Sequence, residues 1–135
     1  MANISVTAGS VLAVGTATRK TGVAGETITA GQALYYSPGD TKYYKAITTT
    51  ATTANVAGIA LTGASVDQPV IMLTAGDINI GGTCAVGEVY VASDTAGAIA
   101  AAGDNGSADY VTVIGIAKTT AIISVKILVS GVAHA

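Results

Sequence analysis

Short runs of β-branched residues and tyrosine, separated by glycine, aspartate and serine, fill this chain from one end to the other. Runs of this kind between turn residues are typical of β-strands. The pattern predicts strands at Ile4–Val6, Val11–Val14, Ala33–Ser37, Lys42–Ile47, Val56–Leu61, Val70–Thr74, Glu88–Ala92, Tyr110–Ala117 and Ile122–Val129. The expected fold class is therefore all-β, a barrel- or sandwich-like domain with very little helix.

The segments between these strands carry turn and loop residues. Ser37–Asp40 predicts a tight turn, because proline presets its own φ and Gly39 is free to adopt a positive φ. The run Thr48–Thr53 predicts an exposed strand end or extended loop, since threonine disfavours helix. The alanine-rich Gly97–Gly103 could form one helical turn, but seven residues are too few to hold a helix alone. Ile122–Val129 is nearly continuous in apolar residues apart from Ser124 and Lys126, which predicts a strand buried on both faces or nearly so.

Three segments of the first half return in the same order in the second half, at offsets of 56, 57 and 55 residues. The matched pairs are Ile28–Ser37 with Cys84–Ser93, Val56–Ala60 with Val113–Ala117, and Val70–Gly76 with Val125–Gly131. The chain is therefore expected to hold two pseudo-repeated β units, residues 28–76 and 77–135, within one compact domain. The N-terminal segment, residues 1–27, contains a partial third copy at Thr7–Leu12.

The repeated positions are glycine, small residues and aliphatics, which shape the backbone and carry no chemistry. Gly31 and Gly87 each precede a strand, where a positive φ would let the chain turn sharply. Gly58 and Gly115 each precede Ile-Ala, where a strand passes close to its neighbour or bulges. A phosphate-binding glycine loop is excluded, because no helix follows any of these glycines.

Charge is unusually scarce. Half of the 135 residues are hydrophobic and only 10% are charged, against about 25% in ordinary domains. A soluble monomer normally carries more surface charge, so we expect a homo-oligomer or a protein packed on another large surface. The alternative is a monomer with a threonine-rich exterior.

The same composition argues against nucleic acid and membrane partners. The net charge is −2 and the six basic residues are scattered, whereas binding phosphates takes a concentrated basic face. Glycine or polar residues interrupt every apolar run well before the roughly 18 residues of a membrane helix. Met1–Ile4 does not resemble a signal peptide, so we expect synthesis in the cytoplasm and delivery by assembly.

Candidate catalytic and metal-binding groups are few. Cys84 is the only cysteine and occupies the apolar position of Ile28 in the repeat, so we expect a small buried hydrophobe. The only histidine, His134, lies beside the C-terminus, and one cysteine with one histidine cannot form a zinc site. Asp104–Gly106 with Asp109 could be read as a Ca²⁺ loop, but the remaining ligands are missing and a turn is favoured. We expect no catalytic residue, no cofactor and no metal.

Tyrosines form the one notable aromatic cluster. Tyr35 and Tyr36 lie on one predicted strand, and Tyr43 and Tyr44, flanked by lysines, lie on the next. Such a cluster could stack nucleic-acid bases. The favoured interpretation is two adjacent strands whose tyrosines are half-buried at an interface.

The order of these motifs resembles a known family. The segments in question read TAGQALYYS, YYKA, VAGIALTGASVDQPVIMLTAG, VGEVYVAS and VTVIGIAKTTAIISVKILVSG. They resemble the small β-rich proteins encoded beside the major capsid proteins of tailed bacteriophages, which include capsid decoration (cement) proteins and head-fibre proteins. The resemblance covers nearly the whole chain. It implies an all-β fold, a homotrimer seated at three-fold axes of the capsid, and a structural role without catalysis.

The expected function is therefore that of a capsid decoration protein on the outer surface of the virion. Its expected partners are the major capsid protein and further copies of itself, and it would stabilise the head by multivalent bridging. The alternative is a carbohydrate- or host-surface-binding β module of a phage tail or fibre, with the tyrosines exposed as a sugar-stacking face. An enzyme is not expected.

The candidate interface residues come from three places in the sequence. In Met1–Val6, apolar and polar residues alternate, as in a strand that can be added to the edge of another sheet. Arg19-Lys20 is the only adjacent basic pair. The alternative is that Ile4–Val6 forms an edge strand of the chain's own sheet and that Arg19-Lys20 is simply solvated. The residues expected at the capsid or subunit interface are Asn3, Ile4, Ser5, Val6, Arg19, Lys20, Tyr35, Tyr36, Tyr43 and Tyr44.

Overall fold

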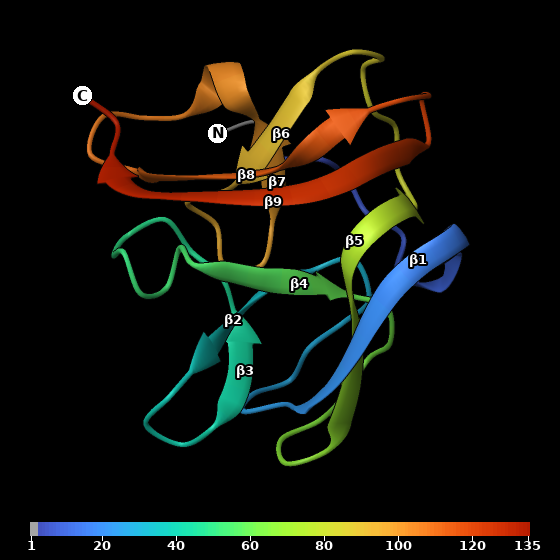
Figure 1. Ribbon diagram of the computed structural model, residues 1–135, viewed down its shortest axis with the longest axis vertical. Helices are drawn as coiled ribbons and strands as arrows, with labels where there is room; N and C mark the ends of the chain where they lie inside the picture. The colour runs from blue at the N-terminus through green and yellow to red at the C-terminus, as the bar shows by residue number, and fades with distance from the viewer. Residues whose placement is uncertain (1–2) are drawn as a thin grey trace.

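The computed structural model describes residues 3–135 and contains nine strands and two 3₁₀ turns (Figure 1). The strands are β1 (Leu12–Val23), β2 (Ala33–Ser37), β3 (Lys42–Lys45), β4 (Val56–Ala60), β5 (Pro69–Asn79), β6 (Val89–Ala92), β7 (Ile99–Ala101), β8 (Tyr110–Ala117) and β9 (Ile122–Ala133). The 3₁₀ turns are Ala8–Ser10 and Ala102–Asp104. The expected all-β fold class is confirmed.

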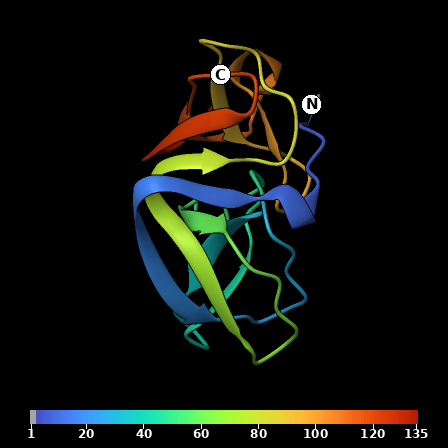
Figure 2. The same cartoon turned by 90° about the vertical axis from the view of Figure 1, so that its right-hand side faces the viewer.

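All strands belong to one strongly curled antiparallel sheet. Its order is β3-β2-β4-β5-β9-β8-β6-β7, and β1 pairs with β5 outside this path. The curl produces two layers, one holding β8, β9 and β6 and the other holding β4, β2 and β3, with β5 passing between them (Figures 1 and 2).

Strand β5 belongs to both layers. Its first half pairs with β4 through Met72 and Leu73, and its second half, Ala75–Asn79, pairs with β9. On the opposite edge, β1 pairs along both halves and bulges where the layers diverge. Gly76 lies at this point with φ of 111°, and a Cβ there would come within 2.9 Å of the Cα of Ala17 in β1. The change of partner along β5 therefore needs glycine.

The main hydrophobic core lies between the two layers. It contains Ile59 and Leu73 from one layer and Ile114 and Ile123 from the other, all fully buried. A second, smaller cluster lies within the first unit and contains Leu34, Tyr43, Met72 and their neighbours. The first unit thus buries two faces of its sheet, one against the second unit and one against its own loops.

Corresponding strands of the two repeated segments have corresponding partners. Leu34 pairs with Gly58 and Tyr90 pairs with Gly115, and in each case the register shifts before the next pair. The β2–β3 hairpin and the β6–β7 hairpin pair in the same register, 56 residues apart. Gly31 and Gly87 both have the expected positive φ, of 90° and 81°. These pairings fit the proposed repeat, whereas superposition of the complete units stays a prediction.

The third sequence match does not hold in the strand register. Ile59 lies opposite Leu73, whereas its counterpart Ile116 lies opposite Ser124. By strand pairing, the counterpart of Leu73 is therefore Ser124. The sequence match predicts Leu128 instead. Aliphatic residues at alternate positions match one another at several offsets, so pattern alone does not determine the register.

Several local expectations were wrong. Ile4–Val6 is not a strand: only Asn3 forms an isolated bridge, to Ala100. The possible helical turn at 97–103 is instead β7 followed by a 3₁₀ turn. In the turn after β2, the positive φ of 58° belongs to Thr41 and not to Gly39.

The threonine-rich run is only partly exposed. Thr48 is fully buried, and its hydroxyl donates to the Asp109 carboxylate at 2.9 Å. Its carbonyl accepts the N–H of Tyr110, also at 2.9 Å. The loop therefore links the first unit to the start of β8.

Replacement of Gly115 by alanine should destabilise the fold. A Cβ there would lie 2.1 Å from the carbonyl oxygen of Ser124, which is backbone of β9 and must shift to make room. We expect a loss of about 1–3 kcal/mol in the free energy of unfolding, measured by urea denaturation. The matched control is Gly39→Ala, since no atom lies within 4 Å of a Cβ at that position. Equal stability of the two variants would contradict the close packing of β8 on β9.

Candidate interaction surface

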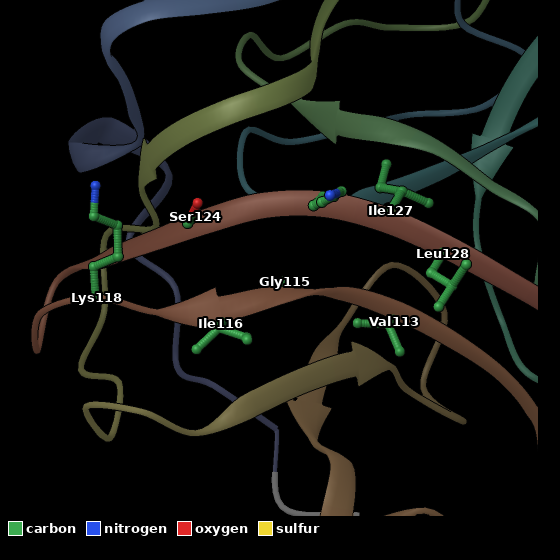
Figure 3. A pocket seen from close by; sticks show the side chains of 8 residues that line it. Val113, Gly115, Ile116, Lys118, Ser124, Ile127 and Leu128 are labelled. Carbon is green, nitrogen blue, oxygen red and sulfur yellow. The ribbon is translucent and has the colours of Figure 1, made fainter.

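The outer face of β8 and β9 carries exposed aliphatic side chains. A groove of about 490 Å³ lies there, lined by Val113, Gly115 and Ile116 of β8 and Leu128 of β9 (Figure 3). Leu128 is 67% exposed and Ile116 is 48% exposed. We name this surface, formed by Val113, Ile116, Ser124, Lys126 and Leu128, the β8–β9 face.

A bulge in β8 creates this surface. In a regular strand, residues three apart point to opposite faces. The register shift between Val113 and Gly115 changes that parity, so that Val113 and Ile116 both line the groove. On β9 the ordinary alternation holds: Ile123 and Val125 are buried in the core, whereas Lys126 and Leu128 are exposed.

The β8–β9 face is almost neutral. Two lysines line its groove, and one of them, Lys118, forms an ion pair with Asp77 at 2.8 Å. Lys126 is exposed on β9. The surface therefore presents aliphatic side chains with little charge to select a highly charged partner.

The four clustered tyrosines lie on paired strands, as predicted. Tyr35 stacks on Tyr44 with ring centroids 5.9 Å apart, and Tyr36 meets Tyr43 at 5.2 Å with the rings tilted by 57°. Tyr43 is buried, Tyr35 and Tyr44 are half-buried, and Tyr36 is 42% exposed. The rings thus contact one another across the strand pair and do not form a flat exposed platform.

Polar contacts hold this cluster in place. The Tyr44 hydroxyl donates to the Asp40 carboxylate, which raises the pKa of Tyr44 to about 12 and lowers the pKa of Asp40. The Lys20 ammonium lies 5.8 Å from the centre of the Tyr43 ring, and its contact with Tyr43 raises the pKa of Lys20. Lys20 is therefore the one predicted interface residue outside the cluster that the structure brings to the tyrosines.

The described part of the predicted N-terminal anchor packs on this chain itself. The Ile4 N–H donates to the carbonyl of Ile99 at 2.8 Å, and the side chains of Ile4 and Val6 pack against the main core. Asn3 exchanges side-chain hydrogen bonds with Ser93 and Thr95, and Ser5 is exposed. Met1 and Ala2 lie outside the described residues. A role of this segment in capsid binding stays a prediction.

Arg19 and Lys20 lie on β1 and are exposed. They lie on the strand that pairs with β5 alone, on the opposite edge of β5 from β9. The structure therefore does not gather the predicted residues into one site.

Cys84 and Asp109 make structural contacts. Cys84 is buried in the main core, and burial raises the pKa of its thiol. The Asp109 carboxylate accepts the N–H of Gly106 at 2.8 Å, as expected for a turn. Within residues 3–135, no group of three or more histidine, cysteine, aspartate or glutamate side chains could hold a metal ion. No helix in the same residues is long and apolar enough to cross a membrane.

The β8–β9 face was missed by sequence reasoning. The run Ile122–Val129 was expected to be buried on both faces, but Leu128 is largely exposed. The useful signal was Ser124 and Lys126, which alternate with buried residues and mark the outer face. Leu128 continues that alternation and lies on the outer face as well.

Replacement of Asp40 by asparagine should lower the pKa of Tyr44 from about 12 toward the usual value near ~10, because the carboxylate that favours the protonated phenol is gone. The measurement is a pH titration of the tyrosine ring carbons by NMR, with Tyr44→Phe to assign the signal. Asp67→Asn is the control, because Asp67 pairs with Lys42. An unchanged Tyr44 titration in Asp40→Asn would exclude this hydrogen bond in solution.

Cys84 should be unreactive in the native protein. Burial raises its pKa in the folded state, so the unfolded chain loses the thiol proton first and this group makes folding less favourable as pH rises above about 9. We expect slow modification by a disulfide reagent at pH 8 and fast modification in denaturant. Cys84→Ala should retain the fold at a packing cost of about 1 kcal/mol. Rapid native labelling would contradict the buried position.

No protein-family model matches this chain, and no curated protein matches it in sequence.

Proposed function

We propose that this protein is a structural component of a tailed bacteriophage, a capsid decoration protein that binds the outer surface of the head. The observation that carries the proposal is the open aliphatic β8–β9 face on a chain with only 10% charged residues. Exposed apolar surface of this kind marks sites of protein association. The resemblance of the motif order to phage decoration proteins supplies the partners, which are the major capsid protein and further copies of this chain.

The physical mechanism is multivalent bridging. An oligomer, a trimer in this proposal, binds several capsid subunits at once, so that modest contacts from each copy add up to tight binding. The bound oligomer ties neighbouring capsid proteins together and so opposes expansion of the shell by the packaged DNA. The exposed basic pair Arg19-Lys20 is the proposed contact with the capsid, since β1 lies on the opposite edge of β5 from β9.

The second candidate function is carbohydrate or host-surface binding by a tail or fibre module. Sugar binding by stacking needs aromatic rings that are exposed and coplanar. Here the rings pair with each other, Tyr43 is buried, and the Tyr44 hydroxyl is bound to Asp40. This geometry favours the decoration protein over the sugar-binding module.

The test is binding to expanded empty capsids assembled from the major capsid protein of the same phage. We expect the purified protein to co-sediment with these capsids at a saturating stoichiometry and to raise their thermal stability. The double variant Arg19→Ala/Lys20→Ala should bind more weakly, whereas Lys42→Ala, which removes an ion-paired lysine of β3, should bind as the unaltered protein does.

Failure of the unaltered protein to co-sediment would contradict the proposed function. Binding of the protein to a glycan array in place of capsids would favour the second candidate. Localisation of the bound protein by electron microscopy then decides between the head and the tail.

A further inference from the structure

Three strand edges of the sheet, those of β3, β7 and β1, are protected against pairing with another chain. The edge of β3 is covered by Gly25 and Glu26: the Gly25 N–H donates to the carbonyl of Tyr43 at 2.8 Å, and the Glu26 carboxylate accepts the Lys45 N–H at 2.9 Å. The edge of β7 is covered by Ile4, whose N–H donates to Ile99. The edge of β1 is interrupted by bulges and carries charged residues, which are common protections against unwanted pairing.

Strand β9 is treated differently. It pairs with β5 only from Ile122 to Lys126, and beyond Lys126 its one partner among the described strands is β8. The segment Ile127–Ala133 contains no charged residue. Leu128 and Val132 in it are 67% and 62% exposed. Ile127 packs on the main core, and Val129 lines a pocket with Ala51 and Thr52, so this uncharged edge is partly exposed. An uncharged strand edge favours association with another chain.

In the first unit, the face that corresponds to the β8–β9 face is buried. Val56 and Ile59 of β4, which correspond in pairing to Val113 and Ile116 of β8, are buried against the second unit in the main core. Ile116 instead is 48% exposed, because no third unit of this chain lies over it. The face of β4 is therefore covered by the second unit, whereas the corresponding face of β8 is exposed.

We infer that the β8–β9 face, together with the adjoining edge Ile127–Ala133, is the surface through which this chain binds a second copy of itself. The inference deepens the proposed function and rests on it, because decoration by multivalent bridging needs an oligomer. The occupant is a second copy because the corresponding face of β4 is covered by the other unit of this same chain. A unit of a second copy covers the β8–β9 face in the same head-to-tail manner, which is the kind of contact that closes into a trimer. A basic or acidic partner would meet no complementary charge cluster there.

The experiment measures the molar mass of the purified full chain by sedimentation at micromolar concentration, for four proteins. They are the unaltered chain, Leu128→Lys, Ile116→Lys and the control Leu12→Lys, whose leucine is 65% exposed on β1 and so matches Leu128 in type and exposure. A lysine at the centre of a dry interface should weaken self-association by about 30-fold or more. We therefore expect an oligomer for the unaltered chain and for Leu12→Lys, and dissociation for the two variants of the β8–β9 face.

Circular dichroism and thermal unfolding establish that each variant is folded. If Leu128→Lys does not fold, Leu128→Ser removes the apolar contact without adding charge and takes its place. A monomeric unaltered chain, or assembly of folded Leu128→Lys and Ile116→Lys like the unaltered chain, would overturn the inference. An oligomer that dissociates as expected but does not bind capsids would support the inference and contradict only the proposed function.

Discussion

The pairing of β5 with two different strands on one edge is the constraint on which the rest of this structure depends. Buried backbone N–H and C=O groups must find partners, and β5 finds them in β4 for Met72–Leu73 and in β9 for Ala75–Asn79. The change occurs at Gly76, where β1 bulges toward β5 and leaves no room for a side chain. Because β5 pairs with a strand of each layer, the two layers face each other and enclose the main core.

This division of β5 also decides which surface stays open. Strand β5 offers β9 five residues, from Ala75 to Asn79, whereas β9 is 12 residues long. The remainder of β9 therefore extends beyond β5 and pairs with β8, while Ile127 still packs on the main core. The proposed self-association surface is thus a direct consequence of how the two layers are joined, and the bulge in β8 adds Val113 and Ile116 to the same face.

The tyrosine cluster lies at an end of the sheet that is closed to further strand pairing. Hydrogen bonds from Gly25, a carboxylate of Glu26 and ring contacts among four tyrosines close the β3 end of the sheet. Ile4 closes the β7 end in a similar way. The N-terminal residues, whose alternation favoured addition to the edge of another sheet, here complete an edge of their own sheet.

The sequence by itself determined the local elements of this protein. Strands β2 and β8 lie where their β-branched and aromatic runs predicted them, end to end, and the burial of Cys84 followed from its aliphatic position in the repeat. The pairing of the tyrosines across adjacent strands was equally visible, since the turn at Pro38 brings their strands together.

Only the tertiary structure decided the full lengths of β1, β5 and β9, the existence of β7, and the exposure of Leu128. Each of these depends on a partner distant in the chain: β7 is a strand because Tyr90–Ala92 and Asn3 pair with it, although its alanines favour helix. The run Ile122–Val129 is largely apolar on both faces, so its composition could not reveal that a second layer covers Ile123 and Val125 and leaves Leu128 exposed. Local preference places a strand, but which of its faces is buried depends on what the rest of the chain lays over it.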